Sequence, residues 1–353
     1  MKKHSVEFNL LIKMKKLLVI IIAGVVLSAC KSVSYGNHLE NPDINTDKVD
    51  AVIKKVFATT CFEGDEARDD AQKILSEYAG GYTDVAFKVY LSASATEAEK
   101  IEKQSPIIRY YKAAYNKVLN ELRNTTSVAE GSVVIWYLYN MGFIIKTPSV
   151  CFGIDISHKY ASSFADYLDF YLITHNHSDH YSNLLINVMN KDNKPVTSNY
   201  LNNSYRKTVP GEYIIKGCTI KTNINDHSRS NLKSVVTYQI DCGNDTGNMI
   251  IMHTGDCGYY DDDDYDIGYN PIDLFIARYV KNNIELNVIG KRANCNYVFL
   301  SHILELGHEI GPDRRDHLDG MDRVRHIRTS VPDTYMPMWG DKMIWKKSTR
   351  KFE

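Results

Sequence analysis

The chain of 353 residues lacks both an excess of basic residues and any low-complexity tract. Its formal net charge is −1, and the first thirty residues hold five lysines and one glutamate, so the remainder has 37 basic and 42 acidic residues. An acidic body argues against a dedicated nucleic-acid binder, because phosphate contacts need a basic face. With 44% hydrophobic residues, the composition indicates a globular protein of one large or two modest domains.

The N-terminal region lacks an apolar run of the roughly 20 residues that span a bilayer. A basic stretch ending at Lys16 is followed by an apolar run to Leu27 and then by Ser28, Ala29 and Cys30. This order resembles a bacterial lipobox, in which the cysteine is lipidated and becomes the mature N-terminus. We therefore expect a lipoprotein signal peptide over 1–30, with translation starting at Met1 or Met14, and a tether over 31–45.

Lipidation of Cys30 would hold the protein on a membrane of the bacterial envelope, with its folded domain outside the cytoplasm. The outer membrane is the favoured location. A short membrane anchor with an incidental cysteine is the alternative interpretation.

The sequence also lacks Cys-x-x-Cys pairs and the close cysteine spacing that indicates a disulfide framework. Six cysteines remain besides Cys30, in a compartment that would permit disulfides. Because the core is large enough without cross-links, we expect most of the six to be buried free thiols, and a single disulfide stays open.

Residues 46–130 are predicted to be a helical segment. A cap at Asn45 or Thr46 precedes the first helix, and apolar residues recur every three or four positions over 65–78 and 95–122. Gly80 and Gly81 interrupt the pattern. No motif in this segment indicates chemistry, so we expect it to pack on the main domain, with partner docking or covering of an active site as alternatives.

After Gly131 the pattern changes to short apolar runs typical of strands. Strands are predicted at 132–147, 150–156, 169–174, 234–241, 249–252 and 296–300, and the runs on either side of 243–247 should pair. Polar or helical segments separate the strands, which favours sheets covered by helices on the outside.

Three histidines and an aspartate lie within six residues directly after the predicted strand 169–174. The order is His175-Asn176-His177-Ser178-Asp179-His180. Imidazole and carboxylate are ligands that suit zinc and other borderline divalent metals. Residues two apart in an extended loop point the same way, so His175 and His177 can share one ion. A following turn into a helix would direct Asp179 and His180 towards a neighbouring ion.

This motif resembles the His-x-His-x-Asp-His hallmark of the metallo-β-lactamase superfamily. The resemblance covers 131–353 and implies an α/β fold, an αβ/βα sandwich of two mixed sheets with helices outside. The run 139–147, with Asp155 closing the next strand, is similar to the hairpin that opens this fold. The other family positions are matched by His227, by the pair Gly255-Asp256 after a strand, and by His302 after the apolar run 296–300.

The resemblance implies a catalytic centre with two divalent metal ions. One ion would be bound by His175, His177 and His227, the other by Asp179, His180 and His302, and Asp256 would bridge both. Zinc is favoured, and manganese or iron accept the same ligands. A water held between two ions about 3.5–4 Å apart has a pKa that falls towards about 7 and becomes a nucleophile at neutral pH. Asp179 would orient this nucleophile.

Several nearby residues have two interpretations. Glu305 and His308 follow His302 by three and six positions, and either could protonate a leaving group or be a supporting or surface residue. His253 is favoured as a strand residue over a metal ligand. Cys257 is favoured as a buried neutral thiol over a thiolate ligand.

No sequence feature selects β-lactams, and the absence of a cysteine at the third ligand position points away from the cysteine-containing lactamases. The ligand pattern is closer to the ascorbate-6-phosphate lactonase-like group, phosphodiesterases and ribonuclease Z, while the acidic body counts against tRNA. The iron-dependent persulfide dioxygenases share the scaffold. We predict a binuclear metal-dependent hydrolase of a small-molecule ester, lactone or phosphodiester. The alternative is a non-enzymatic binding lipoprotein of the envelope that retains the metal-binding scaffold.

Overall fold

The computed structural model describes residues 45–64, 66–228, 230–258, 271–279, 289, 293–309 and 314–353. The signal peptide, Cys30 and all of the tether but its last residue lie outside these ranges, so the lipoprotein prediction is not tested. Across the described ranges, no helix has both the length and the apolar character needed to cross a bilayer.

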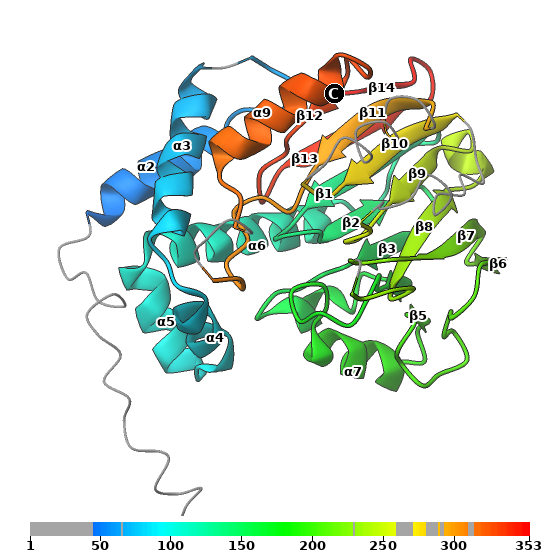
Figure 1. Cartoon of the computed structure of the whole chain (residues 1–353), viewed down its shortest axis with the longest axis horizontal. Coiled ribbons are helices and arrows are strands. Elements are labelled where there is room, and N and C mark those ends of the chain that lie inside the picture. Colours follow the sequence, from blue (N-terminus) through cyan, green and yellow to red (C-terminus); the bar gives the residue numbers. More distant parts are fainter. Residues whose placement is uncertain are drawn as a thin grey trace, which may run out of the picture. The chain divides into compact units, whose positions relative to one another are not determined.

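Two seven-stranded mixed sheets form the centre of the fold (Figure 1). The first has the strand order β14-β13-β1-β2-β3-β4-β5, and the second has the order β12-β11-β10-β9-β8-β7-β6. The strands of the first sheet are β1 (Ser132–Tyr137), β2 (Phe143–Lys146), β3 (Cys151–Ile154), β4 (Phe170–Leu172), β5 (Val196–Thr197), β13 (Lys342–Lys346) and β14 (Lys351–Phe352). Those of the second are β6 (Gly211–Ile215), β7 (Cys218–Asn225), β8 (Val235–Asp241), β9 (Ile250–His253), β10 (Ile272–Ala277), β11 (Cys295–Leu300) and β12 (Thr334–Tyr335).

Both predicted hairpins are present, and the one that opens the fold is formed by β2 and β3, which pair antiparallel. Strands β8 and β9 pair antiparallel with Tyr238 opposite His253, as predicted. The run 132–147 is not one strand, because a turn separates β1 from β2 and they pair antiparallel. Asn140 has a positive φ of 60° in this turn, and Leu138 N–H donates to the Gly142 carbonyl at 2.8 Å. The chain therefore reverses within five residues.

The helices are α2 (Thr46–Phe57), α3 (Glu66–Gly80), α4 (Asp84–Ser92), α5 (Ala95–Gln104), α6 (Pro106–Asn124), α7 (Asn183–Lys191) and α9 (His317–Arg328), with 3₁₀ turns η1 (Ala161–Phe164) and η2 (Asn244–Thr246). The single helical run predicted over 95–122 is two helices. Ser105 caps the second one by accepting from Ile108 N–H, and Pro106 is its first residue. Proline fits that position because its missing N–H would have no partner there.

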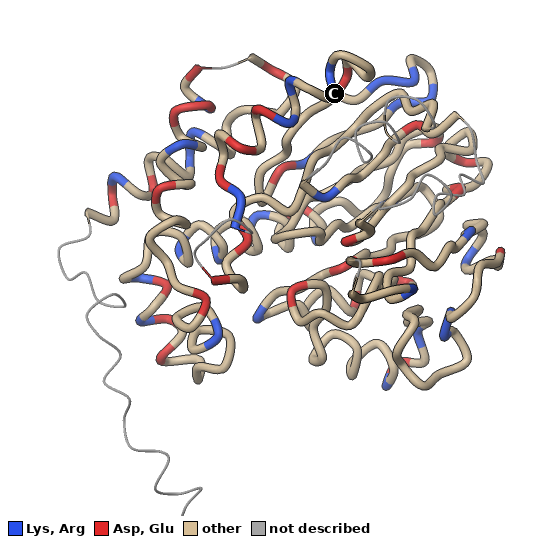
Figure 2. Tube along the Cα trace, viewed as in Figure 1, with Lys and Arg blue, Asp and Glu red and all other residues tan. Residues whose placement is uncertain are grey.

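Helices cover the outer faces of both sheets. Helices α6 and α7 with η1 pack on the first sheet through a shared buried cluster that includes Val118, Trp136, Ile144, Phe164 and Leu185. Helix α9 contacts β12 of the second sheet and also α3 of the helical segment. Basic and acidic residues are interspersed over helices and strand ends alike (Figure 2). These layers confirm the predicted αβ/βα sandwich with an N-terminal helical segment.

Cysteines contribute packing rather than cross-links in the described part of the chain. The six cysteines there are free thiols, five of them buried and Cys61 half-buried. This agrees with the expectation of mostly buried free thiols.

Candidate metal centre

Four of the predicted ligands lie on the loop between β4 and α7. Strand β4 is fully buried and ends at Leu172, so it delivers this loop to the edge of the first sheet. The expected turn into a helix is wrong in detail, because α7 begins only at Asn183. A tight turn closed by His180 N–H on the His177 carbonyl, at 2.9 Å, redirects the chain instead.

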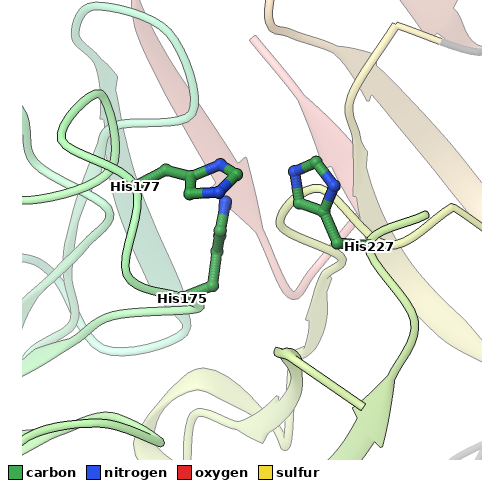
Figure 3. Close-up of side chains that lie close together, drawn as sticks. All are labelled: His175, His177 and His227. Carbon is green, nitrogen blue, oxygen red and sulfur yellow. The ribbon is translucent and has the colours of Figure 1, made fainter. Parts of the chain in front are cut away.

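His175, His177 and His227 point towards one another from two loops (Figure 3). Their ring centroids are 4.5 to 5.2 Å apart, and each offers a nitrogen within 4.8 Å of the others. His227 follows the end of β7, and its N–H donates to the Asn231 carbonyl at 3.0 Å. The preceding Asp226 carbonyl accepts from Gly258 N–H at 2.8 Å, which ties this loop to the one that follows β9.

A second group of ligand atoms, from Asp179, His180 and His302, lies beside the first, and Asp256 groups with His175 and His180. The Nε2 atom of His180 is 3.4 Å from Asp179 Oδ2 and 3.4 Å from Asp256 Oδ1. Asp256 Oδ2 is 3.4 Å from His302 Nε2 and 3.6 Å from His227 Nε2. Asp256 is thus adjacent to ligands of both predicted ions, and the structure brings all seven predicted ligands together.

The convergent atoms have no hydrogen-bond partners, although they are buried. This holds for Nε2 of His175, His180, His227 and His302 and for Oδ1 of Asp256. Buried polar atoms in native proteins are nearly always satisfied, so five orphaned atoms facing one space call for a bound group. Ligand atoms on a tetrahedral ion at about 2.0–2.1 Å would be about 3.4 Å apart, close to the distances found here. The residues fit divalent cations.

Asp155 and Thr174 fix the tautomers of two of these histidines. Thr174 Oγ1 donates to Asp155 Oδ2 at 2.6 Å, so it must accept the hydrogen bond from His175 Nδ1 at 3.0 Å. Asp155 Oδ2 also accepts from His180 Nδ1 at 2.8 Å. With both Nδ1 atoms protonated, both Nε2 lone pairs are directed into the centre, which is the arrangement that orients metal-binding histidines.

Gly255 allows Asp256 to approach this edge. Its φ is +50°, and a Cβ there would lie 2.6 Å from the Thr174 side chain. Close packing of the loops after β4 and β9 therefore requires a glycine directly before Asp256.

Burial and charge set the protonation of the ligands. Burial holds the pKa of His175 well below its usual value and also lowers that of His177. Burial alone would raise the pKa of Asp256, but His302 and His180 hold it well below its usual range. Burial alone would lower the pKa of His180, but Asp256, Asp179 and Asp155 raise it well above its usual value. The carboxylates thus favour a positive charge at this position, which a bound cation would supply in place of a proton on His180 Nε2.

Glu305 and His308 form a pair next to Asp179. Glu305 is fully buried and accepts hydrogen bonds from Tyr139 Oη at 2.7 Å, from the N–H groups of Gly307 and His308, and from His308 Nδ1. Its oxygens are therefore occupied. The hydrogen bond that His308 donates to Glu305 raises the pKa of His308 to about 9. His308 is half-exposed, with 46% of its side chain accessible, so it can contact a bound molecule while Glu305 holds it.

His253 and Cys257 are not ligands. His253 Nε2 is 3.0 Å from the Met141 carbonyl, and its Nδ1 accepts from Gly255 N–H at 3.2 Å, so both ring nitrogens are occupied within the sandwich. Cys257 is fully buried and belongs to none of the ligand groups formed by the described residues. Both agree with the favoured interpretations.

Asn140 is a site residue that no sequence motif indicated. Asn140 is fully buried, and its Nδ2 donates to the carbonyl of Asp179 at 3.1 Å and to Asp179 Oδ2 at 2.9 Å. Its own carbonyl accepts from His302 N–H at 3.1 Å, and His302 has a positive φ of 61°. An asparagine in a hairpin turn is an ordinary sequence signal, so its contact with two ligands 39 and 162 positions away was not predictable.

We expect Asn140→Ala to reduce hydrolytic activity by about 10–100-fold, because residues that orient metal ligands have effects of that size. Alanine is strained at the positive φ of 60° found at this position, so we also expect a stability loss of about 1 kcal/mol, which leaves the protein folded. Steady-state kinetics and metal content measure the effect. Asn124→Ala, at an exposed asparagine of α6, is the matched control and should leave both unchanged. Equal activities of the two variants would contradict the positioning role.

No protein-family model and no curated protein matches this sequence. The structure is similar to Igni18, a metallo hydrolase from the archaeon Ignicoccus hospitalis, at 14% identity and a TM-score of 0.47, over 61% of this chain and 99% of that one. It is also similar to YhfI, a metallo-β-lactamase fold protein from Bacillus subtilis, at 14% identity and a TM-score of 0.45, over 61% of this chain and 99% of that one.

Two mixed sheets with helices outside, and a histidine and aspartate cluster on loops at their shared edge, are the arrangement that the sequence resemblance implied. The strand orders and layers are those of a metallo-β-lactamase-type αβ/βα sandwich. In this metallo-β-lactamase fold, the ligands come from the ends of β4, β7, β9 and β11.

Proposed function

We propose that this protein is a metal-dependent hydrolase with a binuclear centre that acts on a small ester, lactone or phosphodiester. The observation that supports it best is the convergence of four histidine Nε2 atoms and one Asp256 oxygen, all buried and without partners. Zinc is the favoured metal, and manganese or iron suit the same donors.

The proposed roles follow from the two ligand groups. His175, His177 and His227 would hold one cation, Asp179, His180 and His302 the other, and Asp256 would contact both. Two such cations supply Lewis-acid polarisation of the substrate and a lowered pKa for water. Asn140 holds Asp179 Oδ2 at 2.9 Å, so the Asp179 carboxylate has a fixed direction in which to orient the attacking water.

The contacts favour His308 over Glu305 as the proton donor to the leaving group. Glu305 is ionised and already accepts from Tyr139, Gly307 and His308, and it lies out of solvent. The pKa of Glu305 lies below its usual value despite burial, because His308 donates to it. Among the described contacts, none engages His308 Nε2. Protonated His308 can therefore release a proton and recover it while Glu305 stays charged.

The proposed setting is the bacterial envelope. Ser28, Ala29 and Cys30 after the apolar run support lipid attachment of Cys30, which would keep the catalytic domain outside the cytoplasm. A small molecule rather than a nucleic acid is the proposed substrate, because the chain beyond residue 30 carries more acidic than basic residues.

Elemental analysis of the purified protein, read with a panel of phosphodiesters, lactones and β-lactams, tests the proposal. We expect about two metal ions per chain and turnover of at least one ester class. Asp179→Ala should reduce that turnover by about 10²–10⁴-fold, the range for loss of a catalytic acid or base.

The matched control is Asp192→Ala, at an exposed carboxylate just after α7, and it should retain full turnover. Protein without metal that stays inactive after zinc or manganese addition would overturn the proposal. Bound metal with no turnover on any substrate would favour the non-enzymatic binding role instead.

A further inference from the structure

A pocket of about 400 Å³ opens beside the first ligand group. His175 and His177 form one of its walls, and the rest is lined by Asn176, Asn199, Tyr200, Arg206, Asn231 and Ser234. A molecule in this pocket would therefore touch both the metal centre and the chain segment that follows β5. No carboxylate is among these lining residues, and Arg206 is the one with a permanent charge.

Arg206 is held in place by one nitrogen of its guanidinium group. Its Nε donates to the Asn199 carbonyl at 3.0 Å. Its side chain is exposed, and among the described residues no carboxylate forms an ion pair with Arg206. Because Nε is the anchored atom, the two terminal nitrogens remain available as donors in one plane.

The segment that carries Arg206 is braced by hydrogen bonds. Arg206 N–H donates to the Asn203 carbonyl at 3.2 Å, and Lys207 N–H donates to the Ser198 carbonyl at 2.7 Å. Asn203 Nδ2 donates to the Val196 carbonyl at 2.9 Å, which ties the segment to β5. An arginine on a braced segment loses little further freedom when it binds a ligand, so the guanidinium group is preorganised.

Other charges near the pocket do not neutralise Arg206. Lys207 Nζ lies over the Tyr213 ring at 4.0 Å, so it adds positive charge on the same segment. Asp226, next to His227, accepts from Lys233 N–H at 2.7 Å and has Lys233 Nζ 3.9 Å away. Among the residues that line the pocket, the one permanent charge is therefore positive and is not paired with a neighbouring carboxylate.

We propose that this pocket binds an anionic group of the substrate, a carboxylate or a phosphoryl group, through the terminal nitrogens of Arg206. Guanidinium presents two parallel N–H donors that match the oxygens of either oxyanion. Asn176, Asn231 and Ser234 supply neutral polar groups around the bound anion. The inference rests on the proposed hydrolase and narrows its substrates to small esters, lactones or phosphodiesters that carry a negative charge beside the reacting bond.

Binding and kinetics on the metal-loaded protein test this inference separately from the hydrolase proposal. Calorimetry with phenyl phosphate, benzoate and neutral benzyl alcohol compares wild type with Arg206→Met, Arg206→Lys and Lys191→Met. Lys191 is an exposed lysine in the last turn of α7, so its variant removes the same charge elsewhere. Direct contact of an anion with the metals is common to all variants and cancels in the comparison.

We expect Arg206→Met to weaken binding of at least one anion by about 10–100-fold, the range for a lost charge-assisted hydrogen bond. Arg206→Lys should retain only part of the wild-type anion affinity, and Lys191→Met should have the same anion affinity as wild type. If Arg206→Met loses more affinity for phenyl phosphate than for benzoate, the subsite binds phosphoryl groups. If it loses more affinity for benzoate, the subsite binds carboxylates. If a substrate is hydrolysed, an anionic ester and a neutral ester of the same size can be compared. Arg206→Met should raise KM for the anionic ester and leave its kcat nearly unchanged. For the neutral ester, both KM and kcat should change little.

Unchanged anion affinity in Arg206→Met would overturn the subsite even if the protein is an active hydrolase. Equal losses for anionic and neutral compounds would also overturn it, because they would indicate a bracing role only. If no compound is hydrolysed but Arg206→Met still loses anion affinity, the subsite stands and the hydrolase proposal fails.

Discussion

Asp256→Ala is expected to lose bound metal and at least about 1000-fold of hydrolytic activity, beyond the 10²–10³-fold that a single electrostatic donor supplies. The reason is its position between the two ligand groups. Its oxygens are 3.4 Å from His180 Nε2, 3.4 Å from His302 Nε2 and 3.6 Å from His227 Nε2. Without this carboxylate, both cations would lose a ligand and the nearest compensating charge. Elemental analysis and kcat/KM measure the two losses.

Thermal unfolding gives a readout of the same change that is independent of activity. Metal that binds only the folded state stabilises it by about 2.7 kcal/mol at a hundredfold excess over Kd. We therefore expect added metal to raise the Tm of wild type but not that of Asp256→Ala. Asp241→Ala, a half-buried carboxylate at the end of β8 that bonds Asn248, is the control and should behave like wild type. Full metal content in Asp256→Ala would exclude the bridging position.

All of the ligands except His227 follow the end of an apolar strand, which made them predictable. Strands β4, β9 and β11 are almost entirely buried, and their last residues precede His175, Gly255 and Ser301 by a few positions at most. Strand ends on two facing sheets bring such loops to one edge, so local sequence was enough to find these side chains. The helical or turn geometry that joins His177 to His180 depended on tertiary packing and was misjudged.

The residues that orient the ligands could not be found in the same way. Asp155 bonds His180 across 25 positions, and Tyr139 bonds Glu305 across 166. These contacts follow from which strands pair and in which register, and pairing of β3 with β4 is parallel and non-local. A single sequence marks Asp155 as the end of a strand but does not identify its partner.

Several strands were missed for related reasons. Strand β7 alternates polar and apolar residues in Cys-Thr-Ile-Lys-Thr-Asn-Ile-Asn, the two-residue period of a half-buried strand, and this local signal was overlooked. Strand β13 pairs with β1, which lies about two hundred positions earlier in the chain, with Val133 opposite Trp345. Such pairing depends on closure of the whole first sheet and leaves no local signal.

Arg68→Met is expected to lower the free energy of unfolding by about 3–5 kcal/mol, the cost of removing one partner of a buried ion pair. Arg68 on α3 donates to Asp341 Oδ2 at 2.5 Å, with the two side chains 3% and 5% exposed. Its NH1 also donates to the carbonyls of Val56 and Thr59, each at 3.0 Å. Denaturant unfolding measures the change. Lys88→Met, which breaks the exposed pair with Asp84, should cost at most about 1 kcal/mol.

The loss should also depend on pH. Burial raises the pKa of Asp341 even though Arg68 acts to lower it, so removing Arg68 raises that pKa further. A carboxyl whose folded pKa lies above its unfolded value binds more protons in the folded state, and stability then falls as pH rises. The deficit of Arg68→Met relative to wild type should therefore be smaller near pH ~4 than near pH ~7. If the difference in the free energy of unfolding between Arg68→Met and wild type does not vary with pH, Asp341 forms an ion pair with another cation in the variant.

A large effect of Arg68→Met would also assign a supporting role to the helical segment. The turn before β13 is held by α3 through the Arg68–Asp341 pair and also by α6. From α6, Tyr110 Oη donates to the Trp339 carbonyl at 2.8 Å and Lys117 Nζ donates to the Gly340 carbonyl at 2.7 Å. Gly340 has a φ of +93°, and a Cβ there would lie 2.9 Å from Phe57 of α2. Three helices thus close on one turn of the first sheet. Deleting 46–130 should for this reason abolish soluble folding, whereas a separate lid would be removed with the sandwich intact.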